Sequence, residues 1–273
     1  IAIDNDDAFE RLAGIADAFL AHDRDIYLRS DDSVVRRAAG GTQFLRRSRG
    51  WVPVPVFLRQ TLPPILACGA ELKNTVCLTK ADQAFLSQHI GDLENLSTYE
   101  FFQKTIAHMQ RILAVRPEII ACDQHPDYLS TRWAEEQAVL PRIRVQHHHA
   151  HIVSCMAEHR LDGTVIGVSC DGTGYGPDGT VWGGEVLLAG ARGFERAAHL
   201  ACVPMPGSAA AIREPWRMAV SYLQDAFGEG LGGLELPSMR DIGPDRVQRV
   251  RAMIAKRINS PLTSSLGRLF DGV

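Results

Sequence analysis

The sequence predicts an α/β fold, because short apolar strands alternate with helical segments over most of the chain. Residues 118–122 and 142–146 have the character of short buried strands, and residues 130–138 between them follow a helical pattern. A strong turn signal, Gly176-Pro177-Asp178-Gly179, joins the next two strand-like runs. The chain has 273 residues, of which 45% are hydrophobic and 22% charged, so it can bury a large core and form two domains.

The first fifty residues predict a small α/β segment. Apolar residues recur near helical spacing over residues 6–20, which predicts a helix, and residues 25–36 alternate as in a strand. Residues 43–47, just after Gly40-Gly41, predict the hairpin partner of that strand. Four prolines then follow within twelve positions, and prolines at this density favour an extended linker: Pro53, Pro55, Pro63 and Pro64. We therefore expect a domain boundary near residues 56–62.

Alternating elements fill most of the remaining chain. We expect strands at 65–68, 75–80, 118–122, 142–146, 165–170 and 180–188, and helices at 97–113, 130–138 and 147–159. Residues 267–271 have the pattern of a further element beginning. Because the chain starts without methionine and stops just after that segment, we expect it to be a piece of a longer protein.

Composition argues against several classes of function. A net charge of −3 gives no general attraction to nucleic acid, although Arg46-Arg47-Ser48-Arg49 is a local basic cluster. No apolar run approaches the roughly 20 residues that cross a bilayer, and the acidic N-terminal segment lacks the features of a signal peptide. The six cysteines form no Cys-x-x-Cys pair, so we expect buried free thiols and a cytoplasmic protein: Cys68, Cys77, Cys122, Cys155, Cys170 and Cys202.

The most informative segment is His147-His148-His149-Ala150-His151, which places four histidines in five positions. On a helix, His147 and His151 lie one turn apart, so both imidazoles can reach one ion. His148 and His151 are also neighbours at i, i+3, and His149 adds a further choice, so spacing leaves the partner of His151 open. A surface cluster or satisfied core histidines are the alternatives to a metal site.

Asp171 is the expected third ligand, because it ends a strand where side chains from different elements can meet. Two imidazoles and one carboxylate leave coordination positions open and suit zinc or iron. His148 stands where an H-E-x-x-H metalloprotease has its glutamate, so a zinc peptidase is disfavoured.

Three further groups could bind a ligand. Gly172, Thr173 and Gly174, with Gly176 after them, form a glycine-rich segment that could approach phosphate or could simply make a hairpin bend. Lys73 and Asn74, in an earlier hairpin turn, offer a cation and an amide to a phosphate. A last group follows a strand end, where ligands of α/β sheets usually bind, or else is a surface loop: Asp123, His125 and Tyr128.

Several blocks along the whole chain resemble, in the same order, the HypF family of carbamoyltransferases of [NiFe]-hydrogenase maturation. The blocks are Asp31-Asp32-Ser33-Val34-Val35-Arg36, Arg46-Arg47-Ser48-Arg49-Gly50, Gly69-Ala70-Glu71-Leu72-Lys73-Asn74-Thr75, Ser87-Gln88-His89-Ile90-Gly91-Asp92-Leu93, Asp123-Gln124-His125-Pro126, the histidine segment, Asp171-Gly172-Thr173-Gly174, Trp182-Gly183-Gly184-Glu185 and Gly267-Arg268-Leu269-Phe270-Asp271.

The resemblance implies that residues 1–58 are the C-terminal part of a YrdC-like α/β domain. Residues 59–273 would be the first part of a Kae1-like domain of the actin-like ATPase fold. The implied reaction uses ATP and carbamoyl phosphate to form carbamoyl-adenylate. The Kae1-like domain then passes the carbamoyl group to the C-terminal cysteine of the partner HypE, for synthesis of the cyanide ligands of the hydrogenase iron.

Site roles follow from the same resemblance. His147, His151 and Asp171 would hold a divalent metal against the phosphate of the adenylate, with Gly172, Thr173 and Gly174 beside it. A set of nucleotide or phosphate contacts is implied elsewhere, with magnesium as a further candidate ion: Lys73, Asn74, Ser33, Arg47 and Arg49. Asp123 and His125 are candidates for substrate binding, and no residue is assigned as catalytic.

The family's acylphosphatase-like and zinc-finger regions are absent, as are most of its YrdC-like domain and the end of its Kae1-like domain with a further metal-binding aspartate. We therefore expect the chain by itself neither to activate nor to transfer carbamoyl groups. The related tRNA threonylcarbamoyl transferases are a second enzyme hypothesis, which the net charge and the YrdC-like tail disfavour. A metal- or nucleotide-binding module without activity is the third hypothesis.

Overall fold

The structure is a computed structural model that describes residues 2–38, 40–234 and 236–273. It divides into two compact units, Ile1–Ile143 and Arg144–Val273, which are described separately. Both mix strands and helices, which confirms the α/β prediction.

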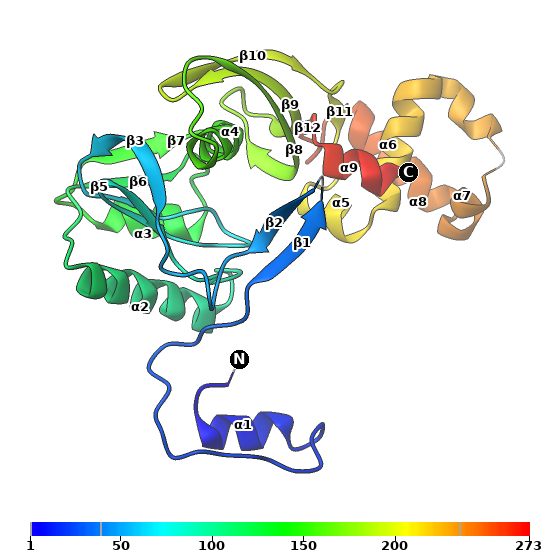
Figure 1. The fold of residues 1–273 in the computed structure, drawn as a ribbon. Helices are drawn as coiled ribbons and strands as arrows, with labels where there is room; N and C mark the ends of the chain where they lie inside the picture. Colours follow the sequence, from blue (N-terminus) through cyan, green and yellow to red (C-terminus); the bar gives the residue numbers. More distant parts are fainter. Residues whose placement is uncertain (1, 39, 235) are drawn as a thin grey trace. The chain divides into compact units, whose positions relative to one another are not determined.

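The first unit is built on a five-stranded sheet in the order β3-β5-β4-β6-β7 (Figure 1). The strands are β3 (Val56–Leu62), β4 (Ile65–Ala67), β5 (Cys77–Leu86), β6 (Ile119–Asp123) and β7 (Arg142–Val145). β4 runs antiparallel to β5 and parallel to β6, with Leu66 opposite both Leu78 and Ile120. Leu66 is buried by this central position of β4. The antiparallel pairing of β4 with β5 confirms the hairpin predicted from residues 65–80.

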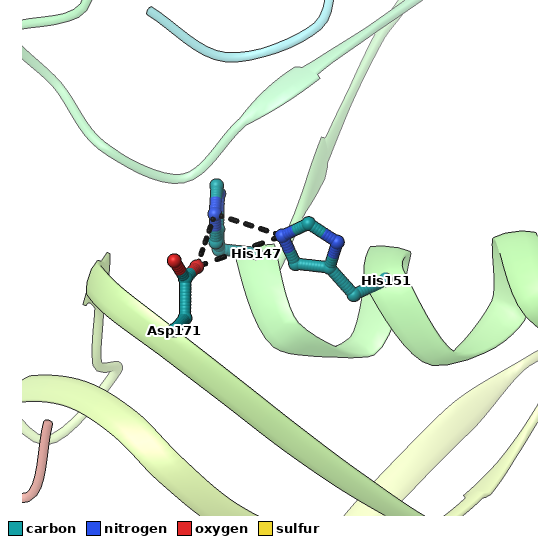
Figure 2. Close-up of side chains that lie close together, drawn as sticks. All are labelled: His147, His151 and Asp171. Atoms are coloured by element: carbon teal, nitrogen blue, oxygen red, sulfur yellow. Dashed lines mark hydrogen bonds and ion pairs between the residues drawn. The ribbon is translucent and has the colours of Figure 1, made fainter. Parts of the chain in front are cut away.

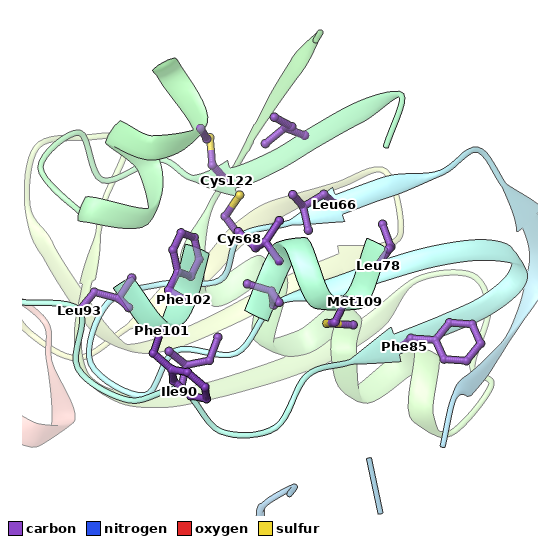
Figure 3. Close-up of a cluster of buried hydrophobic side chains, with 14 of the residues drawn as sticks. Leu66, Cys68, Leu78, Phe85, Ile90, Leu93, Phe101, Phe102, Met109 and Cys122 are labelled. Atoms are coloured by element: carbon purple, nitrogen blue, oxygen red, sulfur yellow. The ribbon is translucent and has the colours of Figure 1, made fainter. Parts of the chain in front are cut away.

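Helices α2 (Leu96–Leu113) and α3 (Leu129–Glu136) complete this unit, as predicted. The inward residues of α2 include Phe102, Ile106 and Met109, which pack with Leu66 and Leu78 in one buried cluster (Figure 3). Asn95 caps α2 by accepting a hydrogen bond from the Thr98 amide, and Ala114 ends the helix in the left-handed conformation.

The predicted linker at residues 56–62 is wrong, because this segment is the strand β3. Its residues pair with β5, with Val56 opposite Ala84 and Phe57 opposite Gln83. The prolines lie outside the strand, two before Val56 and two after Leu62, and so remove no donor from its ladder. The assignment of residues 1–58 and 59–273 to two different domains stays a prediction.

The N-terminal predictions are partly wrong. The helix predicted for residues 6–20 is α1 (Asn5–Leu12), which ends just before Gly14 and buries none of its residues. The strand predicted for residues 25–36 is the shorter β1 (Val34–Ala38), which pairs with β2 (Gly41–Arg46) as the expected hairpin. The alternation in residues 25–33 produces no strand, since its pairing among the described residues is limited to an isolated bridge between Asp32 and Arg49.

The second unit contains a sheet in the order β10-β9-β12-β11, and β8 pairs with β9. Its strands are β8 (Val165–Tyr175), β9 (Val181–Gly190), β10 (Gly193–His199), β11 (Val203–Pro204) and β12 (Leu262–Thr263). Helix α4 (His147–Glu158) packs on β8 and β9 through Ile152 and Met156, which join Trp182 and Leu187 in a buried cluster.

The remaining helices lie in the C-terminal part of the chain (Figure 1): all but the last come between β11 and β12, and the last follows β12. They are α5 (Ala209–Arg213), α6 (Trp216–Phe227), the 3-10 helix η1 (Gly228–Gly233), α7 (Pro237–Ile242), α8 (Pro244–Ala255) and α9 (Leu266–Gly272). The element expected at residues 267–271 is α9.

The glycine-rich segment after Cys170 does not form a turn, which corrects that expectation. Gly172 and Gly174 lie inside β8, and the pairing of β8 with β9 shifts register between Cys170 and Gly174. This irregularity is a bulge in a continuous strand, and the reversal comes later, where the Gly179 amide donates to the Gly176 carbonyl. The predicted hairpin of β8 and β9 is confirmed.

All six cysteines are free thiols, but their burial differs. Cys68 and Cys122 are buried as predicted, whereas Cys155 and Cys170 are exposed, which corrects the expectation for these two. Among the described residues, no helix is both long and apolar enough to cross a membrane.

Candidate metal centre

Helix α4 begins immediately after β7, and Gln146 is its N-cap. The Gln146 Oε1 accepts a hydrogen bond of 2.9 Å from the His149 amide and so satisfies one of the free donors at the start of the helix. The helix therefore contains the whole histidine segment from its first residue, and His147 and His151 lie one turn apart on one face, as the spacing predicts.

His147, His151 and Asp171 converge on one point in the second unit (Figure 2). The His147 Nε2 lies 3.0 Å from the Asp171 Oδ2 and 3.2 Å from the His151 Nε2. The His151 Nε2 is 3.6 Å from the same Oδ2. One nitrogen from each ring and one carboxylate oxygen thus face a common centre.

The three side chains differ in exposure, and the difference gives the site an open side. The side chain of His147 is 14% exposed, that of Asp171 28% and that of His151 58%. Burial raises the pKa of the Asp171 carboxyl, but hydrogen bonds from His147, His151 and the Gly172 amide outweigh it and hold the pKa below its ordinary value. Asp171 is thus an anion at neutral pH, as a ligand must be.

His148 and His149 have surroundings that differ from those of His147. The His149 Nε2 donates to the Gly190 carbonyl at 2.8 Å. His148 is fully buried, and burial lowers its pKa to about 4, so its ring is neutral at pH 7. His147 is therefore the histidine that lies with His151 and Asp171 in the candidate cluster.

Ser265, the N-cap residue of α9, forms hydrogen bonds with the backbone around Asp171. The Ser265 hydroxyl lies 2.7 Å from the Gly172 carbonyl and 3.2 Å from that of Asp171, and it also accepts the Arg268 amide as the N-cap of α9. Gly267 and Gly183 allow this close packing, since a Cβ on Gly267 would lie 2.7 Å from the Gly172 Cα. The sequence did not predict this contact of Ser265 with Asp171 and Gly172, because the residues are nearly a hundred positions apart. The only local signal at Ser265 is that serine is a common N-cap residue before a helix.

The donor set fits a divalent transition metal. Two imidazole nitrogens and a carboxylate oxygen suit zinc or iron, and three protein ligands leave positions for other oxygen ligands. All three candidate ligand atoms lie within 4.8 Å of one another. A groove of about 520 Å³ is lined by His151 and Asp171 together with apolar side chains of α4 and β8, so a ligand can reach two of the three residues.

The glycine residues beside the site have different surroundings. A Cβ on Gly174 would lie 2.4 Å from the His148 Cε1, whereas a Cβ on Gly172 would meet no atom within 4 Å. The Gly172 amide donates to the Asp171 Oδ1 at 2.7 Å. Gly174 is thus needed for packing, and phosphate binding by Gly172, Thr173 and Gly174 stays a prediction.

The other predicted site residues lie in the first unit. Ser33, Arg47 and Arg49 come together at the base of the β1–β2 hairpin. The Ser33 hydroxyl donates to the Arg49 carbonyl and accepts from the Ser48 amide, Arg49 pairs with Asp32 at 2.6 Å, and the Arg47 guanidinium stacks on Phe44. These contacts order the hairpin base, and binding of a nucleotide there stays a prediction.

Lys73 and Asn74 are adjacent in the chain but differ in environment. Lys73 is exposed, whereas Asn74 is 1% exposed and donates to the carbonyls of Cys68 and Ala70. Asn74 therefore shapes the loop between β4 and β5, and Lys73 is the one of the two that a ligand in solution can reach.

Asp123, His125 and Tyr128 lie together at the end of β6, as the strand-end argument predicted. The Asp123 carboxylate accepts the His125 amide at 2.8 Å, and the rings of His125 and Tyr128 stack at 4.1 Å. Asp123 is 8% exposed. The loop is thus an ordered polar group, whose use for substrate binding stays a prediction.

Two family models match consecutive parts of the chain. Residues 60–158 match the HypF Kae1-like domain, and residues 167–273 match the second subdomain of the carbamoyltransferase Kae1-like domain. This chain belongs to the HypF family. The resemblance drawn from the sequence blocks is thereby confirmed.

Curated HypF relatives match nearly the whole chain. It is 50% identical over 273 residues to carbamoyltransferase HypF2 of Cupriavidus necator and 47% identical over 271 residues to carbamoyltransferase HypF of Rhizobium leguminosarum bv. viciae. The alignments cover 98% and 99% of this chain but 33% and 35% of the relatives. The chain thus spans about a third of the length of these relatives.

Two solved HypF structures share the fold. A full-length HypF crystallised in a phosphate- and nucleotide-bound form is 43% identical, with a TM-score of 0.93 over 100% of this chain and 42% of that one. The HypF of T. kodakarensis is 38% identical, with a TM-score of 0.89 over 100% of this chain and 37% of the other.

Proposed function

We propose that this chain provides the carbamoyl-transfer part of a HypF carbamoyltransferase of [NiFe]-hydrogenase maturation. In the proposed reaction, carbamoyl phosphate is hydrolysed to carbamate and phosphate, and the carbamate oxygen attacks the α-phosphate of ATP, which gives carbamoyl-adenylate and releases pyrophosphate. The carbamoyl group then passes to the C-terminal cysteine of HypE for synthesis of a cyanide ligand. The curated relatives named as carbamoyltransferases support this proposal. We place the reaction in the cytoplasm, where six free cysteines stay reduced.

The observation that carries the proposal is the convergence of His147, His151 and Asp171 within a HypF-family chain. We infer that these residues hold a zinc or iron ion, with magnesium as a further ion that accompanies ATP. Such an ion would supply Lewis-acid polarisation of a phosphate oxygen. The protein's contribution is to fix the ligands: Gln146 begins the helix that carries both histidines, and Ser265 holds the strand that carries Asp171.

The transfer step is a substitution at the carbamoyl carbon. The cysteine thiolate attacks that carbon, a C–S bond forms, and the bond to the phosphate oxygen breaks, so that AMP leaves with its electron pair. The groove beside His151 and Asp171 gives the reactants access to the centre. Gly172, Thr173 and Gly174 are the proposed neighbours of the phosphate, and Lys73 is a proposed contact in the first unit.

A chimera tests the proposal with a complete enzyme. This chain replaces the matching third of Cupriavidus necator HypF2, with which it is 50% identical. Transfer of the labelled carbamoyl group of carbamoyl phosphate to HypE is then measured, with pyrophosphate release from ATP as a second readout. We expect the chimera to transfer label, and His147→Ala in it to slow transfer by at least about 100-fold while pyrophosphate release persists.

The matched control is His149→Gln in the same chimera, because the His149 ring donates a hydrogen bond to the Gly190 carbonyl and is not one of the three proposed metal ligands. Its transfer rate should equal that of the unsubstituted chimera. Label on tRNA in place of HypE would show a threonylcarbamoyl-type acceptor. An inactive chimera beside an active parent, or unchanged transfer by the His147→Ala chimera, would contradict the proposal.

A further inference from the structure

The Nε2 of His148 is a buried polar atom without a hydrogen-bond partner among the described residues. Its ring is fully enclosed, with 0% of the residue exposed. The Asp171 Oδ2 lies 3.9 Å away, too far for a hydrogen bond but on the buried side of the carboxylate. Because proteins seldom bury an unpaired polar group, this one calls for a physical explanation.

The tautomer of His148 follows from its other nitrogen. The Gln146 side-chain amide lies 3.1 Å from the His148 Nδ1, while the Gln146 Oε1 is engaged by the His149 amide. Gln146 therefore presents its N–H group to His148, and Nδ1 must be the acceptor. In a neutral imidazole, the proton is then on Nε2, the nitrogen that faces Asp171.

The ring has no freedom to move away from this orientation. A Cβ on Gly174 would lie 2.4 Å from the His148 Cε1 and 3.0 Å from its Nε2, so the strand backbone lies directly against the ring. The rings of His147 and Trp182 lie on other sides, with centroids 5.4 and 6.0 Å away. Gln146, Gly174 and these rings together hold the N–H at one place.

We propose that His148 is a positioning residue for the metal centre, whose Nε2–H supports the Asp171 carboxylate from the buried side. Asp171 has its Oδ1 held by the Gly172 amide and its Oδ2 shared by His147 and His151. When Oδ2 is engaged by a metal ion, the His148 donor is the buried group best placed to fix the orientation of the carboxylate. Such outer partners commonly set ligand orientation and metal affinity. The inference rests on the proposed metal site.

The test is a Co²⁺ titration of the full chain, followed by the visible absorption of the bound ion. Three variants are compared with the wild type: His148→Phe removes the donor and keeps a planar aromatic ring, His148→Gln returns an N–H at the Nε2 position, and His149→Gln is the matched control. We expect His148→Phe to weaken Co²⁺ binding about 10- to 100-fold with an altered absorption spectrum, His148→Gln to recover affinity to within about threefold, and His149→Gln to be unchanged.

The outcomes separate the inference from the site on which it rests. No Co²⁺ binding by the folded wild type would overturn the metal site and the inference together. Wild-type binding that His148→Phe leaves unchanged would overturn the role of His148 alone. Equal losses in His148→Phe and His148→Gln, both folded by circular dichroism, would also overturn it, because packing and not the donor would then be responsible.

Discussion

The backbone of Gly174 lies directly against the imidazole of His148: a Cβ at position 174 would come within 2.4 Å of the His148 Cε1 and 3.1 Å of the His147 Cδ2. A strand residue thus sets the position of two histidines from the neighbouring helix. Any side chain at Gly174 must displace one of them or the strand itself.

Gly174→Ala should therefore destabilise the chain by about 1–3 kcal/mol, the usual cost of overpacking. It should also weaken metal binding, because the displaced rings include the proposed ligand His147. Urea unfolding and Co²⁺ titration measure the two effects. The control is Gly172→Ala in the same strand, where a Cβ would meet nothing within 4 Å. Equal stability of the two variants would contradict the packing argument.

Metal binding should depend on His147, His151 and Asp171 together. Replacing any one of them by alanine should lower the affinity for Zn²⁺ by at least about 100-fold, beyond the 10- to 100-fold typical of outer-shell partners. Competition with a chromogenic chelator measures this affinity. Full Zn²⁺ affinity in His151→Ala would remove that residue from the ligand set, despite its 3.6 Å approach to Asp171.

Glu185 is a fully buried carboxylate that links three strands of the second unit. It pairs with Arg196 of β10 at 2.7 Å and accepts hydrogen bonds from the Gly183 amide and from Ser264, which follows β12. Glu185→Gln should lower the free energy of unfolding by about 3 kcal/mol at pH 7, because Arg196 loses its anionic partner and the amide NH2 must face donors at one of the two carboxylate oxygen positions. The same change at exposed Glu195 of β10 should alter stability by less than about 0.5 kcal/mol.

The effect of Glu185 should also depend on pH. Burial raises the pKa of this carboxyl, but hydrogen bonds from Arg196, Ser264 and Gly183 outweigh it and hold the pKa below its ordinary value of 4.5. The folded state thus binds its proton less readily than the unfolded state, so the stabilisation is complete above pH 4.5 and is lost as the pH falls through the folded pKa. Urea unfolding of wild type and Glu185→Gln from pH 7 to pH 3 should therefore show a shrinking difference. A constant difference would contradict the ionised state of Glu185.

Thiol labelling should divide the cysteines by burial. Cys155 and Cys170 are exposed and should react within minutes with an alkylating reagent at pH 8. Cys68 should stay unlabelled in the folded chain, because burial and the neighbouring Cys122 raise its pKa to about 12. Mass spectrometry of peptides from native and urea-unfolded samples locates the label. Rapid labelling of native Cys68 would show that this part of the core opens.

Features that depend on neighbours in sequence were predictable. The i, i+4 spacing of His147 and His151 placed both on one face of α4. Asp171 lies beside them as expected, but the prediction that it ends a strand is wrong, because β8 continues through it to Tyr175. The α2 helix and the β8–β9 hairpin likewise follow from local periodicity and turn residues. Local geometry is enough to determine these relations without a distant partner.

Features that depend on distant partners were not predictable. The segment 56–62 is a strand because β5 supplies its hydrogen bonds, whereas residues 25–33, with equally suitable alternation, pair among the described residues only at an isolated bridge between Asp32 and Arg49. The same holds for the site: the sequence presented four equivalent histidines. Only the packing distinguishes them: the Gly174 backbone lies against His148, the Gly190 carbonyl accepts from His149, and Asp171 lies beside His147. Sequence thus determined which side chains share a helix face, and the tertiary structure decided which surroundings each one meets.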